Sequence, residues 1–503
     1  MPVETERQRP PLTAAEQKVI IERMNPILQA RCGQLGTNIL GIKGGQAYID
    51  ARLSRFAGES KISWEGGVRQ DGSEVTGRKN QAHCIPYLSR IANKINQYLF
   101  SEAPRRDALA PEIADNITRD GTTMAEFFNT VNDYLTSCGW CWIGIDAPNV
   151  ENPRTVSIQF KEKNNLRPYW NVYSPLDVVD WAFDDRGKLL WVLTAGAESN
   201  NISALSKPSR RRYRMLWEPG LVRKFYISES GDKIEAMAEF PIQLQEAPFV
   251  LVGRPALDPH VFDSLESVNR TIMDLGSCNR QNFFDAVFPQ LCIPASVIAR
   301  AAEILQTTQE RAVEMTVGFN FPIVIGEGDP TPSYITPDTT GFAEMRNEII
   351  ELRYALFETA GLLPKIDSKQ MQSAESKAWD YLELEQLLKH RALTLQSAER
   401  KAVQISNAWD NNFPNYQPEY NLRFDVENFV QDIQAIVMAS QVSMPDEMTR
   451  VLLGKLFKAV RRIGGDELAP AEIKTVLEAI ENYTALRSLP FGFESTEEEE
   501  EEE

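Results

Sequence analysis

The sequence predicts an α+β protein that is mostly α-helical. Three stretches between residues 258 and 410 carry apolar residues at helical spacing, whereas residues 141–253 contain short runs rich in aromatic and β-branched residues. Hydrophobic residues make up 43% of the 503-residue chain and charged residues 25%, which is ordinary for a globular protein. This length predicts roughly two to four domains.

The N-terminal half begins with a helical region and continues into strands. Residues 13–106 have a helical pattern, clearest over 85–100, and a further helix is predicted at 122–137. The predicted strands that follow are 141–146, 167–173, 189–194, 211–217, 222–227 and 249–252.

Three long helices are predicted in the second half. The first has Asp258 as N-cap and Pro259 at its first position, and it ends near Pro289. Its apolar residues are Phe262, Leu265, Val268, Ile272 and Leu275. The second runs from Thr336 to Gly361, with Met345, Ile349, Leu352 and Leu356 on one stripe. The third follows a polar segment at 364–373, and at 1.5 Å per residue it reaches roughly 50 Å. Its apolar residues are Ala378, Leu382, Leu384, Leu388, Leu395, Ala402, Ile405 and Trp409.

The remaining segments are an insert and a C-terminal region. Residues 289–335, between the first two long helices, form a small Pro-containing insert of mixed structure. Residues 427–484 are predicted to be helical in short pieces broken by Pro445, Gly464 and Pro470. The run from Glu497 to Glu503 repels itself and is predicted to be disordered.

Charge and cysteine usage exclude several classes of protein. A net charge of −18 argues against an extended basic face that grips nucleic acid, although it permits nucleic acid to slide past. No apolar run approaches the length of a membrane span, and the N-terminus lacks the apolar core of a signal peptide. The 6 cysteines have irregular spacing, so we expect reduced thiols in a cytosol-like compartment.

Four local motifs have both a chemical and a structural interpretation. Cys138-Gly-Trp-Cys141 has the spacing of a redox site, but a strand pattern follows it where a helix N-terminus is needed. Gly41–Gly45 lacks the spacing of a phosphate-binding loop and predicts a turn. For the arginines at 210–212 and 214, a solvated face or a subunit-interface ion pair is favoured over nucleic-acid binding. The carboxylates Asp425, Glu427, Asp184 and Asp185 have no histidine nearby to complete a nuclease metal site. We therefore expect no enzyme activity, metal or cofactor.

The order of these parts resembles the portal protein of tailed double-stranded-DNA bacteriophages, over about residues 20–486. Several short segments resemble those at corresponding places in portal proteins: Phe100–Pro104, Cys138–Asp146, Tyr173–Trp181, Thr359–Pro364 followed by Ser373–Ser376, and Val442-Ser443. The resemblance implies a portal fold divided as follows: N-terminal arm 1–19, α/β wing 20–256, stem helix 257–288, clip 289–335, stem helix 336–363, tunnel loop 364–376, long wing helix and return strand 377–426, crown 427–486 and acidic tail 487–503.

The resemblance also implies a function. Portal proteins form a ring, typically of twelve subunits, at one capsid vertex of the virion, and the ring is assembled in the host cytoplasm. It conducts DNA during packaging and ejection, and it contacts terminase, the major capsid and scaffold proteins and a tail adaptor. Applied here, the candidate DNA-contacting residues of the tunnel loop are Lys365, Asp367, Lys369 and Gln370. The candidate terminase- or tail-binding residues of the clip are Gln290, Arg300, Glu303, Glu310 and Arg311.

Two other classes of function remain open at this point. One is a DNA-processing nuclease that uses carboxylate-bound metal ions, and the other is a helical scaffold or adaptor with no role on DNA. Only the portal interpretation requires rings with a central hole as wide as DNA.

Overall fold

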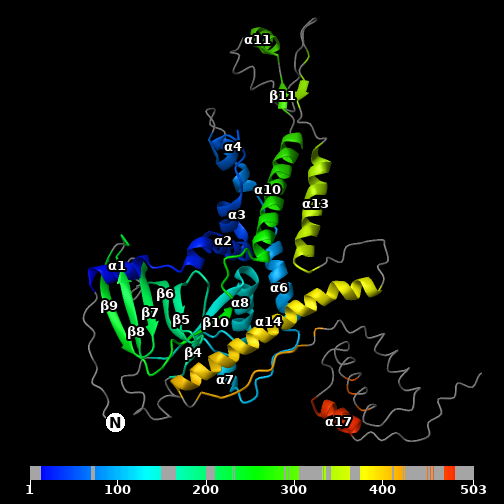
Figure 1. Cartoon of the computed structure of the whole chain (residues 1–503). Coiled ribbons are helices and arrows are strands. Elements are labelled where there is room, and N and C mark those ends of the chain that lie inside the picture. The colour runs from blue at the N-terminus through cyan, green and yellow to red at the C-terminus, as the bar shows by residue number, and fades with distance from the viewer. Residues whose placement is uncertain are drawn as a thin grey trace, which may run out of the picture. The chain divides into compact units, whose positions relative to one another are not determined.

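The computed structural model describes residues 13–68, 74–148, 166–199, 210–228, 230–231, 233–287, 290–292, 294–304, 331, 333–335, 341–362, 374–410, 413–422, 424, 450, 454, 457 and 470–481. These residues form the α+β fold that the sequence predicts (Figure 1). The chain divides into two compact units, residues 1–424 and 425–503.

The two larger sheets of the first unit are antiparallel. A three-stranded sheet in the order β10-β3-β4 consists of Phe249–Gly253, Trp140–Asp146 and Tyr169–Tyr173. A five-stranded sheet runs in chain order from β5 to β9. Its strands are β5 (Val178–Phe183), β6 (Leu189–Ser199), β7 (Arg210–Glu218), β8 (Leu221–Ile227) and β9 (Ile234–Pro241). All six predicted strands are confirmed, whereas β5 and β9 were not predicted.

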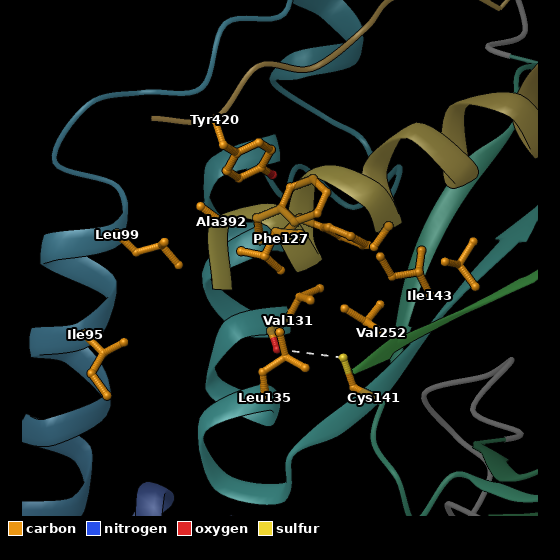
Figure 2. Close-up of a cluster of buried hydrophobic side chains, with 14 of the residues drawn as sticks. Ile95, Leu99, Phe127, Val131, Leu135, Cys141, Ile143, Val252, Ala392 and Tyr420 are labelled. Carbon is orange, nitrogen blue, oxygen red and sulfur yellow. Dashed lines mark hydrogen bonds between the residues drawn. The ribbon is translucent and has the colours of Figure 1, made fainter. Parts of the chain in front are cut away.

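Helices α2 (Pro26–Lys43), α6 (Tyr87–Leu99) and α8 (Met124–Cys138) build the core with the three-stranded sheet. A capping box between Thr123 and Glu126 begins α8, and Gly139, with φ +84°, ends it before β3 starts. Figure 2 shows side chains from α6, α8, β3, β10 and α14 meeting in one buried cluster. Cys141 lies in that cluster, and burial raises the pKa of its thiol. A redox-active cysteine needs the opposite shift.

The long helix α14 (Ala374–Trp409) spans 36 residues, about 54 Å at 1.5 Å per residue. It contacts β10, α6 and β3, so the predicted third helix is confirmed as part of the core. The predicted apolar residues Leu384, Leu388, Leu395, Ala402 and Ile405 are all buried. This stripe explains why so long a helix stays attached to the three-stranded sheet and its helices.

A buried carboxylate joins α14 to two distant segments. Glu399 has no exposed surface, and its oxygens accept hydrogen bonds from Arg106 at 2.6 and 3.1 Å. The hydroxyls of Tyr416 and Tyr420 donate to the same carboxylate at 3.0 and 2.7 Å. Burial lowers the pKa of Arg106, but its bonds to Glu399 and the Glu399 charge outweigh that effect and raise it. The cluster is a fully hydrogen-bonded ion pair inside the core.

Helix α1 (Ala14–Glu22) is fastened to the five-stranded sheet by arginines. A capping box between Thr13 and Glu16 begins the helix. Arg214 on β7 donates to the carbonyls of Ile20 and Arg23. The neighbouring β7 arginines also bond within the chain, Arg211 to Glu235 and Arg212 to the Ser228 carbonyl. These intrachain bonds give the arginine cluster a structural role.

A small lobe follows α2 and contains a β-hairpin that was not predicted. The lobe comprises α3 (Gly45–Arg52), α4 (Lys61–Glu65), β1 (Gly66–Val68), β2 (Glu74–Thr76) and α5 (Arg78–Gln81). The expectation that 13–106 is helical throughout is therefore wrong at β1 and β2. Gly44 and Gly45 have positive φ, so the Gly41–Gly45 motif forms the predicted turn. The one-turn helix α7 (Pro111–Ala114) lies further along the chain.

The first two long helices are α10 (Val261–Val287) and α13 (Gly341–Thr359), which pack side by side (Figure 1). The predicted start of α10 at Asp258 is wrong by two residues. The His260 imidazole accepts from the Phe262 N–H, and the Asp263 carboxylate accepts from the His260 N–H. This reciprocal pair satisfies free donors of the first turn in the manner of a capping box.

The second unit is described over few residues. Its helix α17 (Pro470–Glu481) begins at Pro470, one of the predicted break points. Most of the predicted crown, and all of the acidic run at 497–503, lie outside the described residues. Among the helices that the structure describes, none is both long and apolar enough to span a membrane.

Candidate functional site: two long helices and the insert between them

One face of α10 carries polar residues along four turns. They recur every three or four positions, at Asp263, Glu266, Arg270, Asp274 and Ser277. Glu266 is buried and accepts from Arg52 at 2.8 and 3.0 Å and from Tyr48 at 3.1 Å. The buried carboxylate is thus neutralised by a cation from the lobe.

Further along α10, two more contacts reach the loop that follows α3. The Asp274 carboxylate accepts from the backbone N–H of Ser54 at 2.8 Å and from its hydroxyl at 2.6 Å. Arg270 donates to the same hydroxyl at 2.8 Å. These bonds fix the position of the lobe along the helix.

Arg78, the first residue of α5 in the lobe, contacts α10 at Ser277. Its guanidinium donates to Ser277 at 2.6 Å and pairs with Glu59 at 2.9 Å. Its carbon centre also lies 4.3 Å from the Phe56 ring and 4.8 Å from the Trp64 ring. Because Arg78 is buried, these partners replace its hydration shell.

The opposite side of α10 is apolar and packs on α13. Phe262, Leu265, Val268 and Ile272 belong to the same cluster as Ile349, Leu352 and Leu356 of α13. Successive helical residues are rotated by about 100°, so Leu265, Val268 and Ile272 lie on the side of α10 away from Asp274. Phe262 precedes Glu266 by four residues and lies on the same side of the helix as Glu266. Helix α10 is therefore held between the lobe on one side and α13 on the other, as Figure 1 shows.

Helix α13 has three chemically different faces. Its apolar stripe faces α10, with Leu356 buried. Four exposed glutamates, Glu344, Glu348, Glu351 and Glu358, follow one flank at helical spacing, and none forms an ion pair within the described residues. The side away from α10 carries Asn347 and Tyr354, and Tyr354 is 37% exposed.

The insert begins and ends in a paired strand. Strands β11 (Gln290–Cys292) and β12 (Ser333–Ile335) are antiparallel, with Gln290 opposite Ile335. They lie at the end of α10 and α13 that is farther from the three-stranded sheet (Figure 1). Between them, α11 (Ala295–Ile304) exposes Arg300 and Glu303, two candidate clip residues. Gln290 lies in β11, whereas Glu310 and Arg311 fall outside the described residues.

The segment after α13 holds the candidate tunnel-loop residues Lys365, Asp367, Lys369 and Gln370, all outside the described residues. Its start is well defined. Gly361 has φ +67°, the Leu362 N–H donates to the Phe357 carbonyl, and the Gly361 N–H donates to the Glu358 carbonyl. This Schellman motif stops α13 at the predicted glycine. The chain becomes helical again at Ala374, directly after the predicted polar segment at 364–373.

The described residues do not assemble the nuclease metal site or the redox site considered from the sequence. Asp184 accepts from the backbone N–H groups of Arg186 and Lys188, which is a turn-forming role. Among the described residues, no group of three or more His, Cys, Asp and Glu residues is placed to hold a metal ion. Asp425 and Glu427 lie outside that set. Burial raises the pKa of Cys138 to about 11, so this thiol is not activated.

The polar face of α10 was missed by the sequence prediction. Its signal is present, because Glu266, Arg270 and Asp274 repeat with the same period as the apolar stripe on the other side. A polar stripe is normally interpreted as a solvent-facing surface. Only the fold shows that Arg31 and Asn38 of α2 bind Asp263 and that partners from residues 48–78 cover the rest of this face.

Comparisons with known proteins give structural likenesses only. No protein-family model matches the chain, and no curated protein sequence matches it. Among solved structures, one similar chain comes from the neck of a native gene transfer agent (GTA) particle computed with C12 symmetry. It is 11% identical, with a TM-score of 0.38, and the match covers 74% of this chain and 90% of that chain. A chain from the neck of an empty GTA particle computed with C6 symmetry is 12% identical, with a TM-score of 0.38 and the same coverage. A chain from the virion of a native gene transfer agent particle is 11% identical, with a TM-score of 0.38, over 84% of this chain and 99% of that chain.

Proposed function

We propose that this protein is a portal subunit, which assembles into a ring at one capsid vertex and conducts DNA during packaging and ejection. The observation that carries the proposal is the stem with its insert. The chain leaves the wing through α10, passes through an insert closed by β11 and β12, and returns through α13. The long helix α14 then packs across the wing. This is the order of parts that the sequence resemblance requires.

The charge distribution supports a conduit rather than a DNA clamp. The glutamate flank of α13 has no internal partners among the described residues, and a wall of like charge prevents a polyanion from adhering. Lys365 and Lys369 would supply weak, transient phosphate contacts between α13 and α14. A ring built this way holds DNA loosely.

The insert is the proposed docking point for terminase and, later, for the tail adaptor. Arg300 and Glu303 are exposed on α11, three residues apart and therefore on one side of the helix. The outer surface of the wing would contact the major capsid and scaffold proteins. The proposal includes no catalytic step, metal or cofactor.

The proposal is tested by the mass and shape of the purified full-length protein. Mass photometry should give a discrete high-mass species of about twelve chains, and negative-stain images should show rings with a central hole. Monomers or dimers alone at all concentrations would favour the scaffold or adaptor alternative. Metal-dependent cleavage of DNA by the purified protein would favour the nuclease alternative.

A second experiment tests the conduit. The variant Lys365→Glu/Lys369→Glu should assemble normally but package or retain less DNA, with a deficit that changes with ionic strength because salt screens phosphate contacts. The matched control is Lys188→Glu/Lys233→Glu, which changes the same charge at two exposed positions of the wing. Equal packaging by both variants at low and high salt would remove the lysines from the proposal.

A further inference from the structure

The lobe, α10 and α13 together form a layered unit whose two outer sides differ in chemistry. The lobe covers one side of α10, and α13 covers the opposite side. Identical subunits that assemble head to tail need two different surfaces facing in opposite directions. The outward side of the lobe and the outward side of α13 meet that requirement.

Exposed apolar side chains occur both on the lobe and on the outward side of α13. On the lobe, Phe56 is 43% exposed, Ile62 41% and Val68 63%, and all three lie within 13 residues of chain. On α13, Tyr354 is 37% exposed on the side away from α10. Aromatic residues that are partly exposed on the free protein are frequent anchors of protein interfaces.

The charges beside these side chains are complementary. Tyr354 is flanked by Glu351 and Glu358, which have no ion-pair partner among the described residues. The lobe exposes Lys61, 81% accessible and only weakly paired with Glu65 at 3.9 Å. Arg55, also exposed on the lobe, donates to the Glu59 carbonyl. Opposite charges at the rim favour a fixed orientation of two copies.

We propose that the lobe of one subunit docks on the Tyr354 side of α13 in the next copy of this chain. Phe56, Ile62 and Val68 would pack around Tyr354, and Lys61 would approach Glu351. The remaining glutamates, Glu344 and Glu348, lie toward the flank that stays free and would face the channel. This interface rests on the proposed ring, and it specifies which two surfaces close that ring.

The first test measures assembly by mass photometry across a concentration series. Tyr354→Asp should raise the concentration needed for half-assembly by about tenfold or more, the size expected for an interface anchor. The matched control Leu393→Asp changes another exposed apolar residue, on α14, and should assemble normally. Glu351→Lys should also weaken assembly, and adding Lys61→Glu should restore it. Circular dichroism and thermal melting establish that each variant is folded.

The second test uses thiol cross-linking and needs no destabilising change. In a background in which Cys32, Cys84, Cys278 and Cys292 are all replaced by Ser, Val68→Cys with Tyr354→Cys should give covalent ladders of several chains with a short bismaleimide. The control pair Val68→Cys with Leu393→Cys should give none. If the parent forms rings but Tyr354→Asp assembles normally and no ladder appears, the interface is wrong and the ring proposal stands. If the parent forms no rings at any concentration, both proposals fail.

Discussion

Removing Arg106 should expose how strongly the core depends on its buried ion pair. Glu399 is fully buried, and Arg106 is its one cationic partner among the described residues, at 2.6 and 3.1 Å. Arg106→Met keeps a similar side-chain volume but leaves the carboxylate with only two tyrosine hydroxyls. Stranding a buried charge in this way costs about 3–5 kcal/mol.

The matched variants separate the charge from the packing. Glu399→Gln in the Arg106→Met background removes the stranded charge and keeps an oxygen that can accept from one tyrosine. We expect the double variant to be more stable than Arg106→Met alone, by about 1–3 kcal/mol, because an unpaired buried charge is worse than an imperfectly bonded amide.

Urea unfolding followed by tryptophan fluorescence provides the measurement, at pH 5 and pH 8. A stranded carboxylate is relieved by taking up a proton, so the deficit of Arg106→Met should be smaller at pH 5. The pH dependence should disappear when Glu399→Gln is added. A loss below about 1 kcal/mol for Arg106→Met, with no pH dependence, would show that water or a shifted side chain replaces the arginine.

Three further predictions concern other parts of the fold. Burial and the nearby Arg391 charge lower the pKa of His260 to about 4, below the unfolded value of about 6.5, so unfolding should become easier as pH falls through this window. About 2 kcal/mol should be lost between pH 7 and pH 5, and His260→Asn, which can still cap α10, should flatten that slope in urea titrations. Gly144→Ala places a Cβ 2.6 Å from the Tyr173 ring and should lower the melting temperature, with a loss of about 1–3 kcal/mol, whereas Gly33→Ala meets nothing within 4 Å in α2 and should be neutral or stabilising. Replacing 295–330 by a short Gly-Ser turn should leave thermal unfolding of the wing unchanged and abolish terminase docking, because β11 and β12 already hold the ends of the insert together; normal packaging by rings of this variant would refute the clip assignment.

The long apolar stripes of α10, α13 and α14 could be predicted because each repeats over many turns. The start of α10 could not, since Asp258 and Pro259 form a better local cap signal than His260. Strand β9 was missed because Glu235, Ala236, Ala238 and Glu239 are poor strand formers. It forms because the edge of β8 offers a complete set of hydrogen-bond partners, so tertiary context overrides local preference.

In the candidate site, too, some features could be predicted from the sequence and others could not. Gly361 and its stop signal were predictable, because a glycine with positive φ is the usual end of a helix. The partners of Glu266 were not, since Tyr48 and Arg52 lie more than 200 residues away in sequence. Lys365, Lys369, Glu310 and Arg311 stay predictions.

The two sides of α10 also differ in how they resist force along the helix axis. Hydrogen bonds have preferred lengths and directions, so sliding α10 by one residue against the lobe would break the contacts of Glu266, Asp274 and Ser277 together. Apolar contacts are non-directional, and α13 buries only Leu356 completely among its side chains. If the insert were pulled along the helix axis, α10 would therefore stay in place against the lobe and α13 would be displaced first. This difference makes α13 the more compliant of the two helices.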